Sequence, residues 1–243
     1  MSEAFAGIPR NMLPTYQFWD APGCPVRSLR DMGSVDISEL GKFDGKALWL
    51  GIGGRNTAYI AAQLHLLSRL ECLVIDGRVI PPRVIDAVAR LHGLKRLELM
   101  NVSTSPVSPL AQLTCLQYLM LSGVSKATNF SFLSKLQELV SLGLGVRSDS
   151  YPSILRSMPS GIECLLLAGP GERVLKATSF DGLKTLPALR YMVLLNCKSD
   201  DKSLDFCLEM PKLKAVTVAR KTWWSCESID RLTDNGIVVS SII

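Results

Sequence analysis

A short apolar pattern recurs eight times between Gly45 and Ala219, and it constrains the fold more than any other feature of the chain. Each copy has an apolar residue, two further residues, a second apolar residue, one variable residue and a third apolar residue. The copies begin at Gly45 (a degenerate copy), Leu70, Leu94, Leu116, Leu139, Ile162, Leu189 and Leu213. Successive copies therefore start 22 to 27 residues apart. A period of this length predicts a solenoid in which each repeat packs against its neighbours.

The apolar pair that encloses one variable residue predicts a short strand in each repeat, because successive side chains of a strand point to opposite faces. Neighbouring copies would pair in parallel. The connecting segments would form the opposite side of the solenoid. Thr57 to Leu67 and Pro81 to Leu91 have apolar residues at helical spacing, and two prolines begin the second segment, where a helix tolerates them.

The connections in the middle of the chain are shorter, and they resemble a known family. Val107 to Leu116 and Phe132 to Leu139 leave room for about two helical turns at most. These two units resemble the short bacterial, internalin-like class of leucine-rich repeats, in which a PLxxLxxL segment precedes LxxLxLxxN. The resemblance is close over residues 94–146 and covers residues 45–220 as architecture. It implies an α/β fold: a right-handed leucine-rich-repeat solenoid, or horseshoe, with a concave parallel β-sheet and a mixed helical and short-turn convex side.

The chain departs from that family at the position where the family carries asparagine. This position holds Arg78, Val102, Val124, Arg147, Pro170, Cys197 and Lys221. The usual asparagine ladder is therefore missing. Many leucine-rich repeats carry asparagine or cysteine at the place of Cys197, so this residue is expected to be a buried thiol that closes the turn after its strand.

The chain is expected to have three parts. Residues 1–44 do not repeat and combine prolines with aromatic residues, so they are expected to form an N-terminal cap segment. Residues 45–220 hold the eight repeats. Residues 221–243 are expected to form a C-terminal cap with a short helix and a final strand, and one indole of Trp223 and Trp224 should cover the core of the last repeat.

Composition and charge argue against several classes of protein. The apolar stretches are shorter than the roughly 18 to 20 residues of a spanning helix, and the start lacks the pattern of a secretory signal. Seven cysteines occur without a CxxC pair, so neither a disulfide framework nor a zinc site is expected. The net charge of +5 is spread along the chain, which disfavours nucleic acid as a partner. We therefore expect a cytoplasmic protein without a membrane or nucleic-acid partner.

The sequence contains few candidates for catalysis. The loop from Gly51 to Asn56 has glycines before a predicted helix and Arg55, which could hold a phosphate, but no Gly-Lys-Ser/Thr follows. The two histidines, His65 and His92, fall in predicted convex segments without the partners that a nucleophilic site needs. We expect no catalytic residue, no cofactor and no metal, and hence no enzyme. A nucleotide-binding enzyme that uses the Gly51 to Asn56 loop is the less favoured alternative.

The side chains on the concave face are the main candidates for function. The central column of this face would be formed by Trp49, Val74, Glu98, Met120, Gly143, Leu166, Val193 and Thr217. Five of these eight residues are large and apolar, and a monomer seldom leaves so many exposed together. The residues predicted to contact a partner are Trp49, Val74, Arg96, Glu98, Met100, Tyr118, Met120, Leu166, Tyr191, Val193, Leu195 and Thr217.

Three explanations of this apolar column remain open: a protein partner, coverage by the N-terminal segment or a loop, and self-association. The first predicts a non-enzymatic protein-binding module. Analogy with small freestanding solenoids suggests an immunity or inhibitor protein that neutralises a toxin or effector. An adaptor or scaffold subunit of a larger complex is the alternative.

Overall fold

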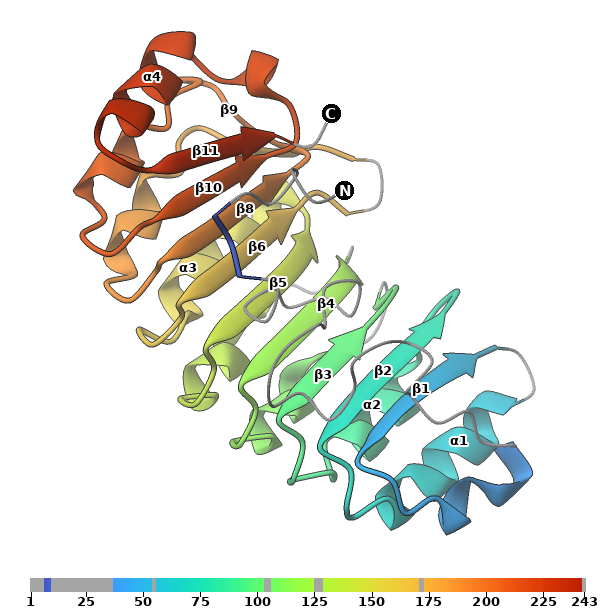
Figure 1. The fold of residues 1–243 in the computed structure, drawn as a ribbon. Coiled ribbons are helices and arrows are strands. Elements are labelled where there is room, and N and C mark those ends of the chain that lie inside the picture. Colours follow the sequence, from blue (N-terminus) through green and yellow to red (C-terminus); the bar gives the residue numbers. More distant parts are fainter. Residues whose placement is uncertain are drawn as a thin grey trace.

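The computed structural model describes residues 7–9, 37–53, 56–102, 106–124, 129–170 and 173–241. Each of the eight repeats contributes one strand to a single parallel sheet, as the repeat predicted (Figure 1). These strands are Ala47–Ile52 (β1), Cys72–Gly77 (β2), Arg96–Leu99 (β3), Tyr118–Val124 (β4), Ser141–Val146 (β5), Cys164–Ala168 (β6), Tyr191–Leu195 (β8) and Ala215–Val218 (β10). Val238–Ser241 (β11) pairs in parallel with β10 as the ninth strand.

The repeat sets the register of this sheet. Leu97 of β3 pairs with Leu73 of β2 and with Leu119 of β4, and the same position pairs through every strand. The core column at this position is fully buried and consists of Leu48, Leu73, Leu97, Leu119, Leu142, Leu165, Met192 and Val216. Because side chains alternate along a strand, the residues on either side of this column face the opposite, inner side of the sheet.

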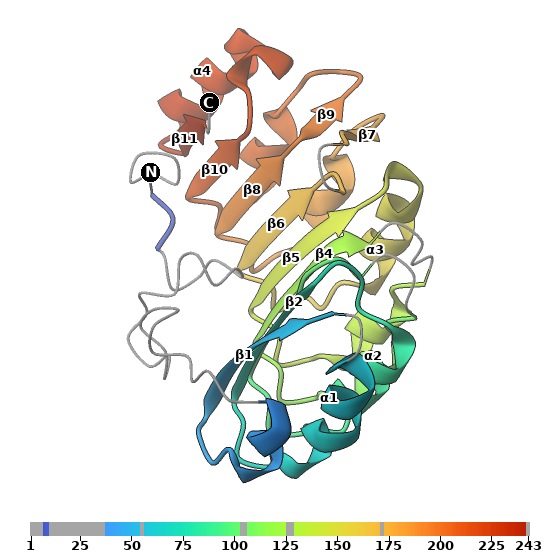
Figure 2. The same ribbon diagram turned by 90° about the vertical axis from the view of Figure 1, so that its right-hand side faces the viewer.

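Helices and tight turns cover the outer side of the curved sheet (Figure 2). The α-helices are Thr57–Gln63 (α1), Pro82–Val88 (α2), Tyr151–Ser157 (α3) and Cys226–Asp234 (α4). The 3-10 helices are Ile37–Lys42, Leu64–Leu66, Ser108–Gln112, Ser131–Lys135, Ser148–Ser150, Asp181–Thr185, Asp205–Glu209 and Lys221–Trp223. The two helices predicted near the N-terminus are present but shorter than expected, and 3-10 helices fill the short connections. In the described ranges no helix is long and apolar enough to cross a membrane.

The longest repeat interval, from Ile162 to Leu189, holds the first strand of a second small sheet that the repeat pattern did not predict. Leu175–Ala177 (β7) pairs in parallel with Cys197–Ser199 (β9). The Leu175 amide donates to the Asn196 carbonyl at 2.8 Å. Asn196 has a positive φ of 49°, which asparagine tolerates better than most residues and which turns the chain between β8 and β9.

The missing asparagine ladder is replaced by several different contacts. Val102 and Val124 are fully buried at the ladder position. The thiol of Cys197 lies 3.3 Å from the carbonyl oxygen of Leu167, to which it donates, so the expected buried thiol is confirmed. Asn101, one residue before the ladder position, has a φ of 64° and donates from Nδ2 to the Gly77 carbonyl at 2.8 Å. The family closes these turns with asparagine at the ladder position. Here they are closed by buried apolar side chains at that position and by an asparagine one residue before it.

Aromatic rings fill the core near the C-terminal end of the solenoid. The ring centroid of Phe180 lies 5.2 Å from that of Tyr151, 6.4 Å from that of Phe206 and 5.9 Å from that of Trp224. Trp224 is buried, so the expected indole cover is confirmed. Helix α4 follows and begins with an N-cap at Ser225. The N-terminal cap expected over residues 1–44 lies mostly outside the described residues.

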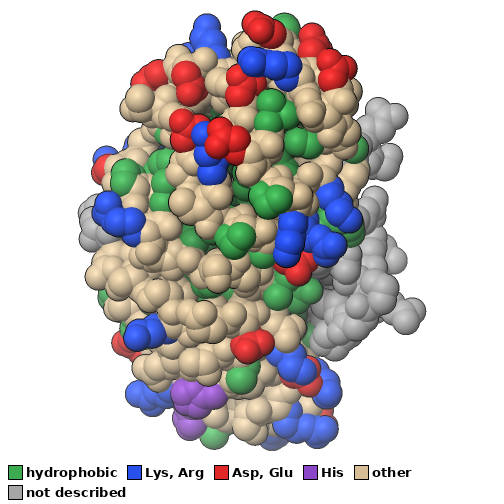
Figure 3. Space-filling model, turned by 90° about the vertical axis from the view of Figure 1, so that its left-hand side faces the viewer, with side chains coloured by type: hydrophobic (Ala, Val, Ile, Leu, Met, Phe, Trp, Pro, Cys, Tyr) green, Lys and Arg blue, Asp and Glu red, His purple; other side chains and the backbone are tan. Residues whose placement is uncertain are grey.

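Ion pairs link neighbouring repeats at the residues that precede the strands. Glu71 lies 2.7 Å from Lys46 and 2.8 Å from Lys95, and Arg190 lies 3.2 Å from Glu163. Basic and acidic side chains are interspersed over much of the face in Figure 3. Hydrogen bonds from Lys46 and Lys95 lower the pKa of Glu71 from 4.5 to about 2.

We predict that Glu71→Gln lowers the free energy of unfolding at pH 7 by roughly 0.5–1 kcal/mol, the size of a favourable ion pair near the surface. The lowered pKa means that the carboxylate stabilises the fold above pH 4.5 and loses this effect as the pH falls towards 2. Urea denaturation at pH 7 and at pH 2.5 measures the difference, with the exposed Glu138→Gln as the control. A loss that is equal at both pH values would contradict the assigned ion pairs.

We also predict that Phe180→Ala lowers the free energy of unfolding by about 3–5 kcal/mol, because it leaves a cavity among three other rings. Leu208→Ala, at an exposed position on the convex side, should change it by at most about 0.5 kcal/mol. Chemical denaturation of both variants tests this, and equal losses would show that the aromatic cluster is not part of the stabilising core.

Candidate functional site

The register brings the twelve residues predicted to contact a partner onto the inner face of the sheet, in three adjacent columns. Arg96, Tyr118 and Tyr191 belong to the first column, which includes the first residue of most strands. The central column has one residue from the strand of each repeat, and it begins with Trp49 on β1 and ends with Thr217 on β10. Leu195 belongs to the third column, at the carboxyl end of β8, and Met100 directly follows β3 at the same position of its repeat. The sequence therefore places these residues correctly in the sheet, and their role in binding remains a prediction.

The exposure expected for the central column is wrong. Of its seven predicted contact residues, all of which the structure describes, Trp49 alone is exposed, at 39%. The buried members are Val74, Glu98, Val193 and Thr217 at 0%, Leu166 at 2% and Met120 at 9%. Arg96 and Tyr191 of the first column are buried as well. A partner cannot contact most of this column while the face stays as the structure shows it.

Part of this burial comes from the N-terminal segment, which was one of the alternatives left open by the sequence. Ile8 is buried in a cluster with side chains of the inner face, and the described segment 7–9, dark blue in Figure 1, lies beside β6 and β8. Together with six side chains of the sheet it forms a separate inner cluster, which consists of Ile8, Met120, Cys164, Leu166, Tyr191, Val193 and Ala215. Gly7, beside it, is packed so closely that a Cβ would lie 3.2 Å from the Cβ atoms of Ala215 and Val238.

Polar groups on the inner face also have contacts within the chain. The guanidinium of Arg96 lies 3.9 Å from the centroid of the Tyr118 ring, in a cation–π contact. The hydroxyls of Thr217 and Ser240 lie 2.8 Å apart and share a hydrogen bond. The shared hydrogen bond satisfies two hydroxyls that would otherwise be costly to bury, and the aromatic ring offsets part of the cost of burying the guanidinium charge.

The accessible part of the inner face lies at the carboxyl ends of the strands. Its members are Gly51, which is exposed, and the half-buried Asp76, Met100, Ser122, Ala168, Leu195 and Ala219. On the same face, Tyr118 at the start of β4 is half-buried and Trp49 in the middle of β1 is exposed. We call these nine residues the accessible edge. It combines aromatic, thioether and aliphatic groups with one carboxylate.

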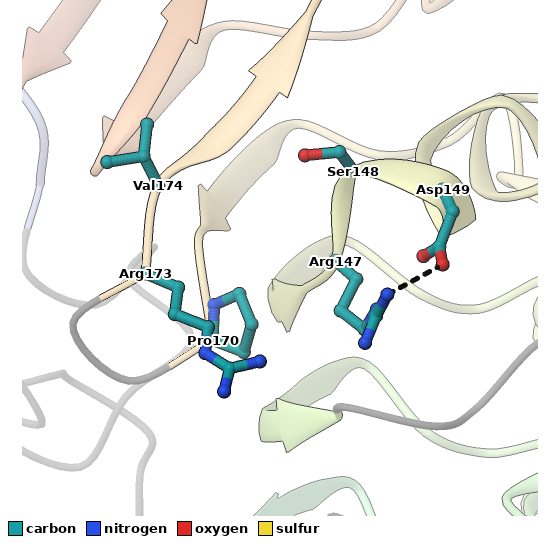
Figure 4. A pocket seen from close by; sticks show the side chains of 6 residues that line it. All are labelled: Arg147, Ser148, Asp149, Pro170, Arg173 and Val174. Carbon is teal, nitrogen blue, oxygen red and sulfur yellow. Dashed lines mark ion pairs between the residues drawn. The ribbon is translucent and has the colours of Figure 1, made fainter.

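A pocket of about 310 Å³ lies near the ends of β5 and β6, and the sequence did not reveal it. Its lining consists of Arg147, Ser148, Asp149, Pro170, Arg173 and Val174 (Figure 4). Arg147 forms an ion pair with Asp149 at 3.2 Å, so much of its charge is compensated inside the pocket. In adjacent repeats, Arg147 and Pro170 occupy the position at which the family carries asparagine. This departure was the one signal in the sequence of an altered turn beside the pocket.

The residues considered for catalysis are not brought into a reactive arrangement. His65 and His92 are exposed, and Nδ1 of His92 lies 3.4 Å from the Gln112 carbonyl oxygen. Among the described residues, no group of three His, Cys, Asp or Glu side chains could hold a metal ion. In the Gly51 to Asn56 loop, Gly53 donates its amide to Asn56 Oδ1 at 2.9 Å, while residues 54 and 55 lie outside the described ranges.

The buried cysteines do not have the properties of catalytic thiols. Burial raises the pKa of Cys164 to about 12, and it raises the pKa values of Cys197 and Cys207 as well. A reactive cysteine needs a lowered pKa and access to solvent. These three buried thiols therefore have structural roles.

Comparison with known proteins gives matches in sequence and in structure. No family model matches the chain. Receptor-like protein 39 of Arabidopsis thaliana is 28% identical over 192 residues, which cover 78% of this chain and 19% of that protein. Internalin C2 of Listeria monocytogenes is 19% identical with a TM-score of 0.49, covering 87% of this chain and 96% of the internalin. The internalin InlF of the same organism is 16% identical with a TM-score of 0.48, covering 87% and 58%.

The chain's own pattern and geometry define its class. Eight copies of the leucine pattern form eight parallel strands in one register, with short helices and turns on the other side. The chain therefore has the fold of a leucine-rich-repeat solenoid. It spans about a fifth of the curated protein that it matches and over half of InlF.

Proposed function

We propose that this chain is a non-enzymatic protein-binding module that recognises a protein partner through the inner face of its sheet. The observation that carries this proposal is the accessible edge, where Trp49, Met100, Tyr118 and Leu195 remain partly open to solvent. Aromatic residues and methionine are enriched at the centres of protein interfaces, and truncation of such residues often costs most of the binding energy.

The geometry of the sheet suits this role. Trp49 lies on β1 and Leu195 on β8, six steps apart in the order of the strands. At about 4.8 Å per step, they are roughly 29 Å apart. A specific interface usually buries about 800 Å² on each side, so a face of this length is large enough to contribute to one. Hydrogen bonds along the sheet fix the backbone that carries these side chains, so little backbone freedom is lost on binding.

A finer proposal concerns the identity of the partner. By analogy with small solenoids that act alone, the partner would be a bacterial toxin or effector that the chain neutralises in the cytoplasm, as an immunity protein does. An adaptor subunit of a larger complex is the second candidate, again by architecture alone. The stoichiometry separates the two: an immunity protein forms a tight one-to-one complex, and an adaptor copurifies with several subunits.

We predict that Trp49→Ala and Met100→Asp each weaken capture of the partner from extracts of the native host by at least tenfold. A tenfold loss corresponds to about 1.4 kcal/mol, and removal of a large apolar anchor commonly costs more. The amount of captured protein is measured by quantitative mass spectrometry and compared with that retained by the wild-type chain.

Leu208→Asp is the matched control, because Leu208 is also an exposed apolar residue (38%) but lies on the convex side. It should retain the partner fully, and all three variants should melt within a few degrees of the wild type. Equal capture by the two inner-face variants and the wild type would refute the proposed binding face.

A further inference from the structure

The inner cluster is separate from the main core, and one of its members comes from a distant part of the chain. Its sheet side chains come from β4, β6, β8 and β10, whereas Ile8 precedes the whole solenoid. Ala168 and Leu195, half-buried, pack against the cluster and connect it with the accessible edge. The cluster and the accessible edge are therefore neighbouring parts of one surface.

Gly7 and Ile8 fit this surface in a specific way. Ile8 is 6% exposed, while Gly7 and Pro9 on either side of it are exposed, so Ile8 is the side chain that anchors this described segment. Gly7 has a φ of +79°, and a Cβ on it would lie 3.2 Å from two Cβ atoms of the sheet. Glycine therefore fits here on two grounds, its backbone conformation and its lack of a side chain.

We propose that the inner cluster is a peptide-binding site for a glycine followed by a branched aliphatic residue, and that Gly7 and Ile8 occupy it until a partner segment of the same chemistry displaces them. This inference rests on the proposed function of the inner face and names the kind of segment that the partner contributes. A segment held in place within the same chain competes at an effective concentration of about millimolar, so it lowers the apparent affinity for any partner.

Cys164 reports whether the site is open. Its thiol is fully buried in the inner cluster, on the face that Ile8 covers. Cys197 is an equally buried thiol that belongs to the main core. Departure of Ile8 exposes the surroundings of Cys164 and leaves those of Cys197 unchanged, because local opening does not require the sheet to unfold.

The test measures the rate at which maleimide labels each cysteine in the full chain, identified by mass spectrometry. Ile8→Asp should increase the labelling rate of Cys164 at least tenfold and leave that of Cys197 unchanged. Addition of a peptide with the sequence of residues 1–10, at millimolar concentration, should slow labelling of Cys164 in this variant back towards the wild-type rate. A peptide with Gly7→Val should have no effect, because a β-branched residue disfavours a φ of +79° and its Cβ would lie 3.2 Å from those of Ala215 and Val238.

An unchanged rate at Cys164 in the Ile8→Asp chain would overturn the inference, and so would a failure of the native peptide to slow it. If Cys197 also becomes reactive, the Ile8→Asp chain is unfolded, and the milder Ile8→Ala variant is judged by the same criteria. The experiment needs no partner. Its failure is therefore distinct from failure of the capture experiment, which tests the proposed function itself.

Discussion

The whole structure depends on the packing of each repeat's leucines against the repeats on either side. Leu97, Leu119 and Leu142 lie next to one another in the register of β3, β4 and β5, and each is fully buried. A slip of one residue in any strand would turn its leucines to the inner face and its variable residues into the core. The core thus fixes which residues line the inner face, although it does not fix what covers them.

Because the core fixes which residues line the inner face but not what covers them, the sequence predicts the position of these residues and not their burial. The strands and their columns follow from a local pattern, so the position of Trp49 beside Val74 could be predicted without a structure. The burial of Leu166 and Val193 could not, because they share a cluster with Ile8, which is far away in the sequence and carries no periodic signal. The small sheet of β7 and β9 was also missed, and the long repeat interval that holds β7 was its one visible trace. Helix α3 lies in a repeat of ordinary length, which left no such trace.

The inner face consequently has two regions with different properties. Around Ile8 it is a closed apolar cluster, and along the carboxyl ends of the strands it remains partly open. A partner that first contacts Trp49 and Met100 would reach the closed region by way of Leu195, which packs against the cluster. Binding at the open region and displacement at the closed region would then be successive steps, and the second would favour partners with a matching segment.

The central claim is that the inner face, and no other, contacts the partner. Hydroxyl-radical footprinting of the full chain with and without its captured partner tests this most directly, because tryptophan, methionine and tyrosine are all readily oxidised. The account predicts that oxidation of Trp49, Met100 and Tyr118 falls in the complex, while oxidation of Tyr59, which is 40% exposed on the convex helix α1, stays unchanged. Protection of Tyr59 with no change at the three inner residues would contradict it.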